Sequence, residues 1–77
     1  MPRPLYEIAR DIRKNWVKVN YAAEPYLLAM QTLTSIDEDY GADDAKSIVL
    51  YFLANAQSFR GEAAKGLKKE LKSLVNP

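Results

Sequence analysis

The chain contains no cysteine and no histidine among its 77 residues. Without cysteine no disulfide can cross-link the fold, and without histidine the commonest metal ligand and the usual general base are missing. The three glycines are scattered, so they form no phosphate-binding loop. These absences predict a cytoplasmic protein that is not an enzyme and that binds no metal and no cofactor.

Long hydrophobic runs are also scarce. The longest, residues 48–54, falls far short of the ~20 apolar residues that a membrane-crossing helix needs, and the N-terminus lacks the apolar core of a secretory signal. We therefore expect no membrane partner. At this length the chain forms one helical domain, residues 1–77, which buries only roughly 60% of its unfolded surface. Small proteins without disulfides often gain stability by oligomerising, and the sequence favours neither the monomer nor the homodimer.

The acidic segment that begins at Asp37 does not fit a calcium-binding loop. Asp37 and Asp39 match the first and third ligand positions, but Gly41 stands where the fifth ligand belongs and Ile48 replaces the closing glutamate. The segment instead belongs to a division of charge along the chain. Residues 1–20 carry five basic and two acidic side chains, residues 21–45 carry six acidic and no basic ones, and residues 46–77 carry six basic and two acidic ones. Association of the acidic block with the last basic block of another copy would weaken with salt.

Apolar periodicity predicts helices over about 4–17, 23–34 and 43–57, and from beyond residue 58 to about 74. On the first helix the inward stripe is Leu5, Ile8, Ala9, Ile12 and Trp16. Ser35 and Glu38 have the spacing of a capping box, which predicts a short helical turn that ends at Gly41. Asp43 and Asp44 supply the next helix start, and Ser58 can cap the last helix.

The segment 43–57 contains the apolar run and organises the predicted fold. Its β-branched and aromatic residues would also suit a strand, but its flanks continue a helical composition and no second strand-like segment is present for pairing. A helix that is apolar all round is typical of the centre of a bundle. We therefore predict an all-α fold, a small three- to four-helix bundle with residues 43–57 as its central helix.

The second predicted helix has no charge between Glu24 and Asp37, and its Leu28 projects roughly opposite Tyr26. Either the bundle buries this helix completely, or the uncharged side is a contact surface for a second copy or another protein. The candidate contact residues are Leu27, Leu28, Gln31 and Thr32.

Basic residues on the first and last helices offer an alternative function, nucleic-acid binding. They can neutralise phosphates, although the pI near 7.9 is low for a nucleic-acid-binding domain and the acidic block would repel phosphate. A solvent-exposed face explains the same residues, and both explanations stay open. The residues are Arg10, Arg13, Lys14, Arg60, Lys65, Lys68, Lys69 and Lys72.

Several segments give the chain a resemblance to small proteins carried by bacteriophages of actinobacteria. They are the residues 3–10, Trp16, residues 25–27, 29–30 and 47–53, Arg60-Gly-Glu62 and residues 69–71. The resemblance spans nearly the whole chain and implies a protein in the cytoplasm of an infected host cell that acts by binding a host or phage protein. It implies no functional residue. The sequence thus predicts a non-enzymatic protein–protein interaction module that binds itself or such a protein, with nucleic-acid binding as the alternative.

Overall fold

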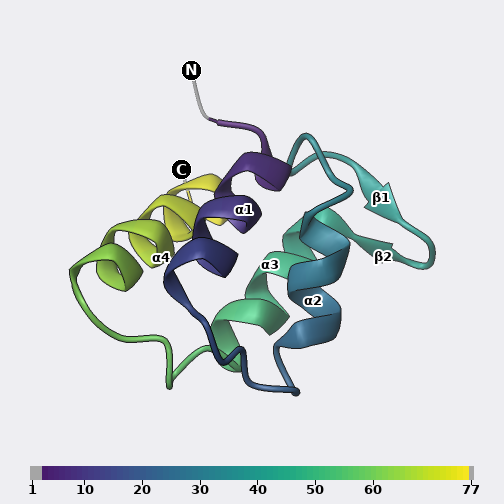
Figure 1. Cartoon of the computed structure of the whole chain (residues 1–77). Coiled ribbons are helices and arrows are strands. Elements are labelled where there is room, and N and C mark those ends of the chain that lie inside the picture. The colour runs from purple at the N-terminus through teal and green to yellow at the C-terminus, as the bar shows by residue number, and fades with distance from the viewer. Residues whose placement is uncertain (1–2, 77) are drawn as a thin grey trace.

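Four helices and one β-hairpin make up residues 3–76, the part of the chain that the computed structural model describes (Figure 1). The predicted mostly helical bundle is confirmed, but a strictly all-α fold is wrong because of the hairpin. The elements are α1 (Leu5–Asn15), α2 (Glu24–Met30), β1 (Asp39–Tyr40), β2 (Asp43–Asp44), α3 (Ala45–Ala54) and α4 (Glu62–Val75).

The helices form a closed ring in which each packs mainly against two neighbours. Helices α2 and α4 both pack against α1 on one side and against α3 on the other. The prediction of a central helix over 43–57 is therefore wrong. Helix α3 covers only residues 45–54 and has an outward side, because a member of a ring cannot be covered all round. Its Leu50 and Tyr51 are 44% and 48% exposed.

The core inside the ring is built around Trp16. The predicted stripe of α1, including Trp16 just beyond the helix end, is buried as expected. The Trp16 ring lies edge-on to Phe52 of α3, with ring centroids 6.1 Å apart, and stacks on Phe59 with centroids 5.0 Å apart. Phe59 belongs to the α3–α4 connection, so this loop contributes to the core as well as joining the two helices.

Helix α1 begins on the backbone that follows α2. The N–H groups of Leu5 and Tyr6, which have no partner inside the helix, donate to the carbonyl oxygens of Thr34 and Leu33 at 3.0 and 2.9 Å. This contact explains why α2 ends at Met30 and not near Thr34 as predicted. The segment after Met30 leaves the helix through tight turns, and its carbonyl groups become available to α1.

The expected helical turn after Ser35 is replaced by the hairpin. Half of the predicted capping box forms, since a Glu38 carboxylate oxygen accepts the backbone N–H groups of Thr34 and Ser35 at 2.6 and 3.3 Å. The Ser35 hydroxyl accepts from Asp37 and not from Glu38, so no helix follows. Strands β1 and β2 pair antiparallel around Gly41, whose φ of +61° starts a two-residue turn of the Gly-X type.

Of the two N-cap residues predicted for the later helices, Asp44 and Ser58, only Asp44 caps its helix. Asp44 caps α3 as predicted, because its carboxylate accepts the backbone N–H of Ser47 at 2.8 Å. Hydrogen bonding from Ser47 lowers the pKa of this carboxyl. Ser58 does not cap α4; Gly61 stands at that position with a φ of +111°, which explains why the helix begins as late as Glu62.

Candidate protein-interaction surface

The outward side of α3 is apolar after its first turn, where Lys46 is exposed. No charged residue occurs in segments 25–36 and 47–59, which include most of α2 and α3. At about 100° per residue, Leu50, Tyr51 and Ala54 fall within one arc of α3, and all are exposed. Tyr26 of α2 extends this surface, because its ring packs against Tyr51 with centroids 5.5 Å apart. We call Tyr26, Leu50, Tyr51 and Ala54 the α3 face.

The α3 face differs from the other exposed apolar residues in its setting. Val17 and Tyr21 are more exposed, at 89% and 88%, but they lie in the α1–α2 connection, where Lys18 separates them. Single exposed apolar side chains are ordinary on protein surfaces. Neighbouring ones on one side of a regular helix are typical of a surface that another chain covers.

Of the four predicted contact residues in and just after α2, one is buried and three are exposed. Leu27 is fully buried, so its assignment to a contact surface is wrong. Because α2 lies between two neighbours in the ring, one of its flanks faces the core where the sequence alone predicted an open surface. Leu28, Gln31 and Thr32 are exposed. The Gln31 side chain nevertheless accepts a hydrogen bond from Arg13 at 2.7 Å, and the Thr32 hydroxyl donates to the Ala29 carbonyl at 2.8 Å.

Leu28 does not join the α3 face. It lies two positions from Tyr26, which places the two side chains about 160° apart around α2. Leu50 and Tyr51, the exposed residues that the sequence prediction missed, belong to the very run that was expected to be buried. The sequence does not reveal their exposure, because only the ring arrangement shows that α3 has more apolar surface than its two main neighbours cover.

The basic residues of α1 are separated from those of α4, and one of them is neutralised. The Arg13 guanidinium donates to both carboxylate oxygens of Glu24 and to Gln31. Its hydrogen bond lowers the pKa of Glu24. Arg10 and Lys14 are exposed. They remain candidates for binding an anion, whereas Arg13 already holds one.

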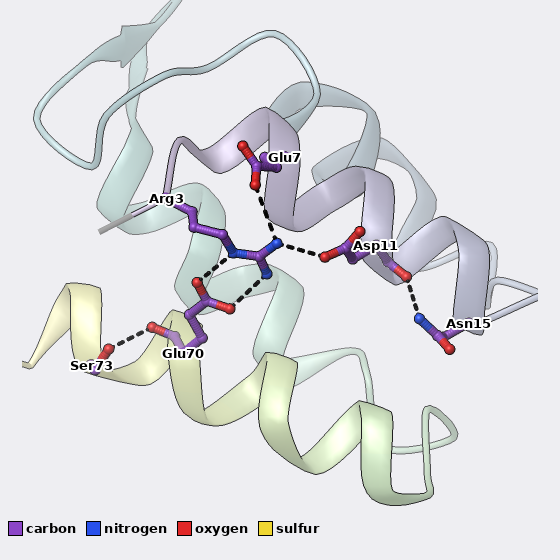
Figure 2. Close-up of polar contacts among 6 residues, drawn as sticks. All are labelled: Arg3, Glu7, Asp11, Asn15, Glu70 and Ser73. Atoms are coloured by element: carbon purple, nitrogen blue, oxygen red, sulfur yellow. Dashed lines mark hydrogen bonds and ion pairs between the residues drawn. The ribbon is translucent and has the colours of Figure 1, made fainter. Parts of the chain in front are cut away.

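An ion-pair network lies between α1 and α4 (Figure 2). Arg3 donates to both carboxylate oxygens of Glu70, at 2.9 and 2.8 Å, and to Asp11 at 2.6 Å, and it lies 3.5 Å from Glu7. Glu7 and Asp11 lie on α1, and both side chains point to Arg3, which precedes the helix. The network places three carboxylates between the basic residues of the two helices.

The lysines of α4 lie mostly on the flank away from this network. Lys68 and Lys72 are each two positions from Glu70, so they point to nearly the opposite side of α4. The Lys68 ammonium lies 5.8 Å from the centre of the Phe59 ring. Burial lowers the pKa of Lys68, and the charges of Lys72 and Arg60 lower it further. The eight predicted basic residues therefore form two groups and no single surface.

A pocket of about 340 Å³ opens where α1 begins, beside the segment after α2. Some of its polar groups already have partners: Arg3 is held by carboxylates, and the N–H groups of Thr34 and Ser35 donate to Glu38. Among residues 3–76 no cluster of acidic side chains is arranged to hold a metal ion. The pocket is lined by Arg3, Pro4, Leu5, Thr34, Ser35, Ile36, Asp37 and Leu74.

Three comparisons of the chain with known proteins find no similar protein. A scan against protein-family models finds no match, and searches of curated proteins and of solved structures also find none. Within the described range 3–76, no helix is both long and apolar enough to cross a bilayer.

Proposed function

We propose that the chain is a non-enzymatic protein–protein interaction module whose α3 face pairs with the α3 face of a second copy. The observation that carries this proposal is the half-exposed pair Leu50 and Tyr51 in the uncharged segment 47–59, with Lys46 at the edge of the face one turn before Leu50. Covering this pair removes apolar area from water, which is worth about 25 cal/mol per Å². Tyrosine is also among the residues that contribute most to protein interfaces.

A second copy suits the α3 face because two such faces can meet without bringing like charges together. In a twofold contact the same residues meet from both chains, so any charge would face its own equivalent. Segments 25–36 and 47–59 contain none. A standard interface takes about 800 Å² from each partner, which is about a sixth of the 5000 Å² accessible surface. The charged sides of α1 and α4 stay in water in this arrangement.

The resemblance to bacteriophage proteins suggests another occupant, a host or phage protein of an infected cell. Such a partner would use the same exposed side chains, because Leu50 and Tyr51 are the apolar groups that α3 leaves uncovered. Mass measurement separates the two occupants, since only self-pairing changes the mass of the purified chain.

Gel filtration with light scattering over a dilution series tests the proposal. We expect the wild type to approach twice 8.7 kDa at high concentration and Leu50→Lys to stay at 8.7 kDa. Val17→Lys, which adds the same charge at an exposed apolar residue outside the face, should behave as the wild type. Circular dichroism should show all three folded. A wild type that remains monomeric throughout would overturn self-pairing.

The absence of native cysteine permits a second test. Ala54→Cys places one thiol on the α3 face and Val17→Cys places one away from it. Under mild oxidation Ala54→Cys should form a disulfide-linked dimer much faster than Val17→Cys, because pairing brings the face against its copy. Equal rates of disulfide formation in the two variants would count against a contact at this face, because random collision alone would then explain the cross-linking.

A further inference from the structure

Arg60 and three lysines of α4 form a basic flank, defined as Arg60, Lys65, Lys68 and Lys72. Lys65, Lys68 and Lys72 follow one another at three- and four-residue spacing, which keeps them on one side of the helix. Arg60 comes from the connection before α4, and its charge acts on Lys68 together with that of Lys72. Lys68 therefore feels the positive charges of both Arg60 and Lys72, and Lys65 lies one turn before it on the same side.

No anion within residues 3–76 neutralises the basic flank. The ion pairs of this part of the chain join Arg3 and Arg13 to carboxylates, and none involves a lysine. Lys68 is kept over the Phe59 ring, which fixes its ammonium group near the loop while leaving it without a carboxylate. An external anion would relieve the repulsion among these side chains.

The acidic hairpin does not cancel the flank. Figure 1 shows α4 and the β1–β2 hairpin on opposite sides of the molecule, which is 28 Å long in its largest dimension. At physiological salt, charges are screened beyond ~8 Å. A ligand at α4 therefore meets the local positive charge, although the chain as a whole carries only +1.

We propose that the basic flank binds the phosphate backbone of nucleic acid without reading its sequence. Lysine ammonium groups are point charges that neutralise phosphates. From Lys65 to Lys72 the flank extends about 10 Å along the helix axis, and duplex DNA carries about six phosphate charges over that length. The flank has no exposed aromatic ring for stacking on a base, since Phe59 is buried beneath Lys68.

The same flank is less suited to a membrane or an acidic protein. A membrane-surface helix inserts apolar side chains beside its lysines, but on α4 Ala64, Leu67, Leu71 and Val75 are buried against the ring. Protein interfaces are depleted of lysine and depend on a buried apolar or aromatic anchor, which the flank does not offer.

Fluorescence anisotropy with labelled duplexes of unrelated sequence tests the inference. We expect binding at ~50 mM salt, with similar affinity for each sequence and a log K that falls with log salt at a slope of about −3 to −4 for four contacts. Lys65→Gln/Lys72→Gln should weaken binding roughly tenfold and reduce the slope by about two. Lys68 is left unchanged because it packs on Phe59.

The matched control is Arg10→Gln/Lys14→Gln, which removes the same charge from α1 beyond the Arg3 network. This variant should keep the wild-type slope. Absence of wild-type binding at ~50 mM salt, where electrostatic binding is strong, would overturn the inference. So would equal losses in the two double variants, or binding of phosphatidylserine vesicles without binding of DNA. Because dimerisation is tested at Leu50, either proposal can fail alone.

Discussion

The guanidinium group of Arg3 holds the carboxylate of Glu70 through two hydrogen bonds, one from Nε at 2.9 Å and one from Nη2 at 2.8 Å (Figure 2). A third donor of Arg3 reaches Asp11 of α1. One side chain therefore ties the beginning of the chain to its last helix. The arrangement raises the pKa of Arg3 through its bonds to Glu70 and Asp11, and it lowers the pKa of Glu70.

Replacing Arg3 should weaken the fold measurably. Exposed ion pairs contribute up to about 1 kcal/mol, and two-bond arginine–carboxylate geometry belongs at the upper end; both side chains here are about one-third exposed. We expect Arg3→Gln to lower the free energy of unfolding by about 1 kcal/mol in urea at neutral pH. Arg10→Gln, at an exposed site, is the control. Equal losses in both variants would mean that the network adds no stability.

Acid should destabilise the chain through Glu70 and Glu24. Bonds from Arg3 and Arg13 lower the pKa of these two carboxyls in the folded state. A carboxyl with a lowered folded pKa contributes stability that is complete above its unfolded pKa of about 4.3 and is lost as pH falls through the folded value. Urea midpoints should therefore decline as the pH drops below ~5. Glu70→Gln should decline less steeply than the wild type; an identical slope would contradict the assignment.

Gly66 offers a stabilising substitution. Gly66 lies inside α4, and a β-carbon added there would meet no atom within 4 Å. Gly66→Ala should raise the free energy of unfolding by up to ~1 kcal/mol through helix propensity. Gly61→Ala is the contrasting variant, because a φ of +111° is strained for alanine. Thermal unfolding should show opposite shifts for the two variants.

Phe59 should behave as a core residue although it lies in a connection. It is 2% exposed and stacks on Trp16. Phe59→Ala should cost about 3 to 5 kcal/mol, as other buried phenylalanine truncations do, whereas Leu28→Ala at a 55% exposed site should stay within about 0.5 kcal/mol. The fluorescence of Trp16, the only tryptophan, reports both transitions. A small loss for Phe59→Ala would contradict the packing.

Local signals in the sequence were sufficient to predict four helical segments and the buried side of α1. The α1 stripe from Leu5 to Trp16 and the Asp44 cap each depend on residues within a few positions of one another. The end of α2 could not be predicted locally, because it is determined by hydrogen bonds from Leu5 and Tyr6 to a segment almost 30 residues later. Gly41 was predicted to end a helical turn, but it begins the turn that joins two strands.

The surfaces were harder to predict than the core. The sequence places Leu27 on an uncharged helix side, but only the position of α2 in the ring shows that this residue is buried. Similarly, Arg13 and Lys14 are equivalent in sequence, while in the structure only Arg13 finds Glu24. The α3 face was missed because an apolar run was equated with burial, and the number of neighbours around a helix cannot be counted from periodicity.

The ring also determines the order in which the chain can fold during synthesis. Arg3 and Glu70 are 67 residues apart, so α1 cannot meet its neighbour α4 until nearly the whole chain has left the ribosome. Helices α2 and α3 are close in sequence and pack together, and pairs with short separation form first. Helix α1 also packs against α2, so we expect nascent chains to leave uncovered only the part of α1 that faces α4 until α4 emerges, when the ring closes in one late step.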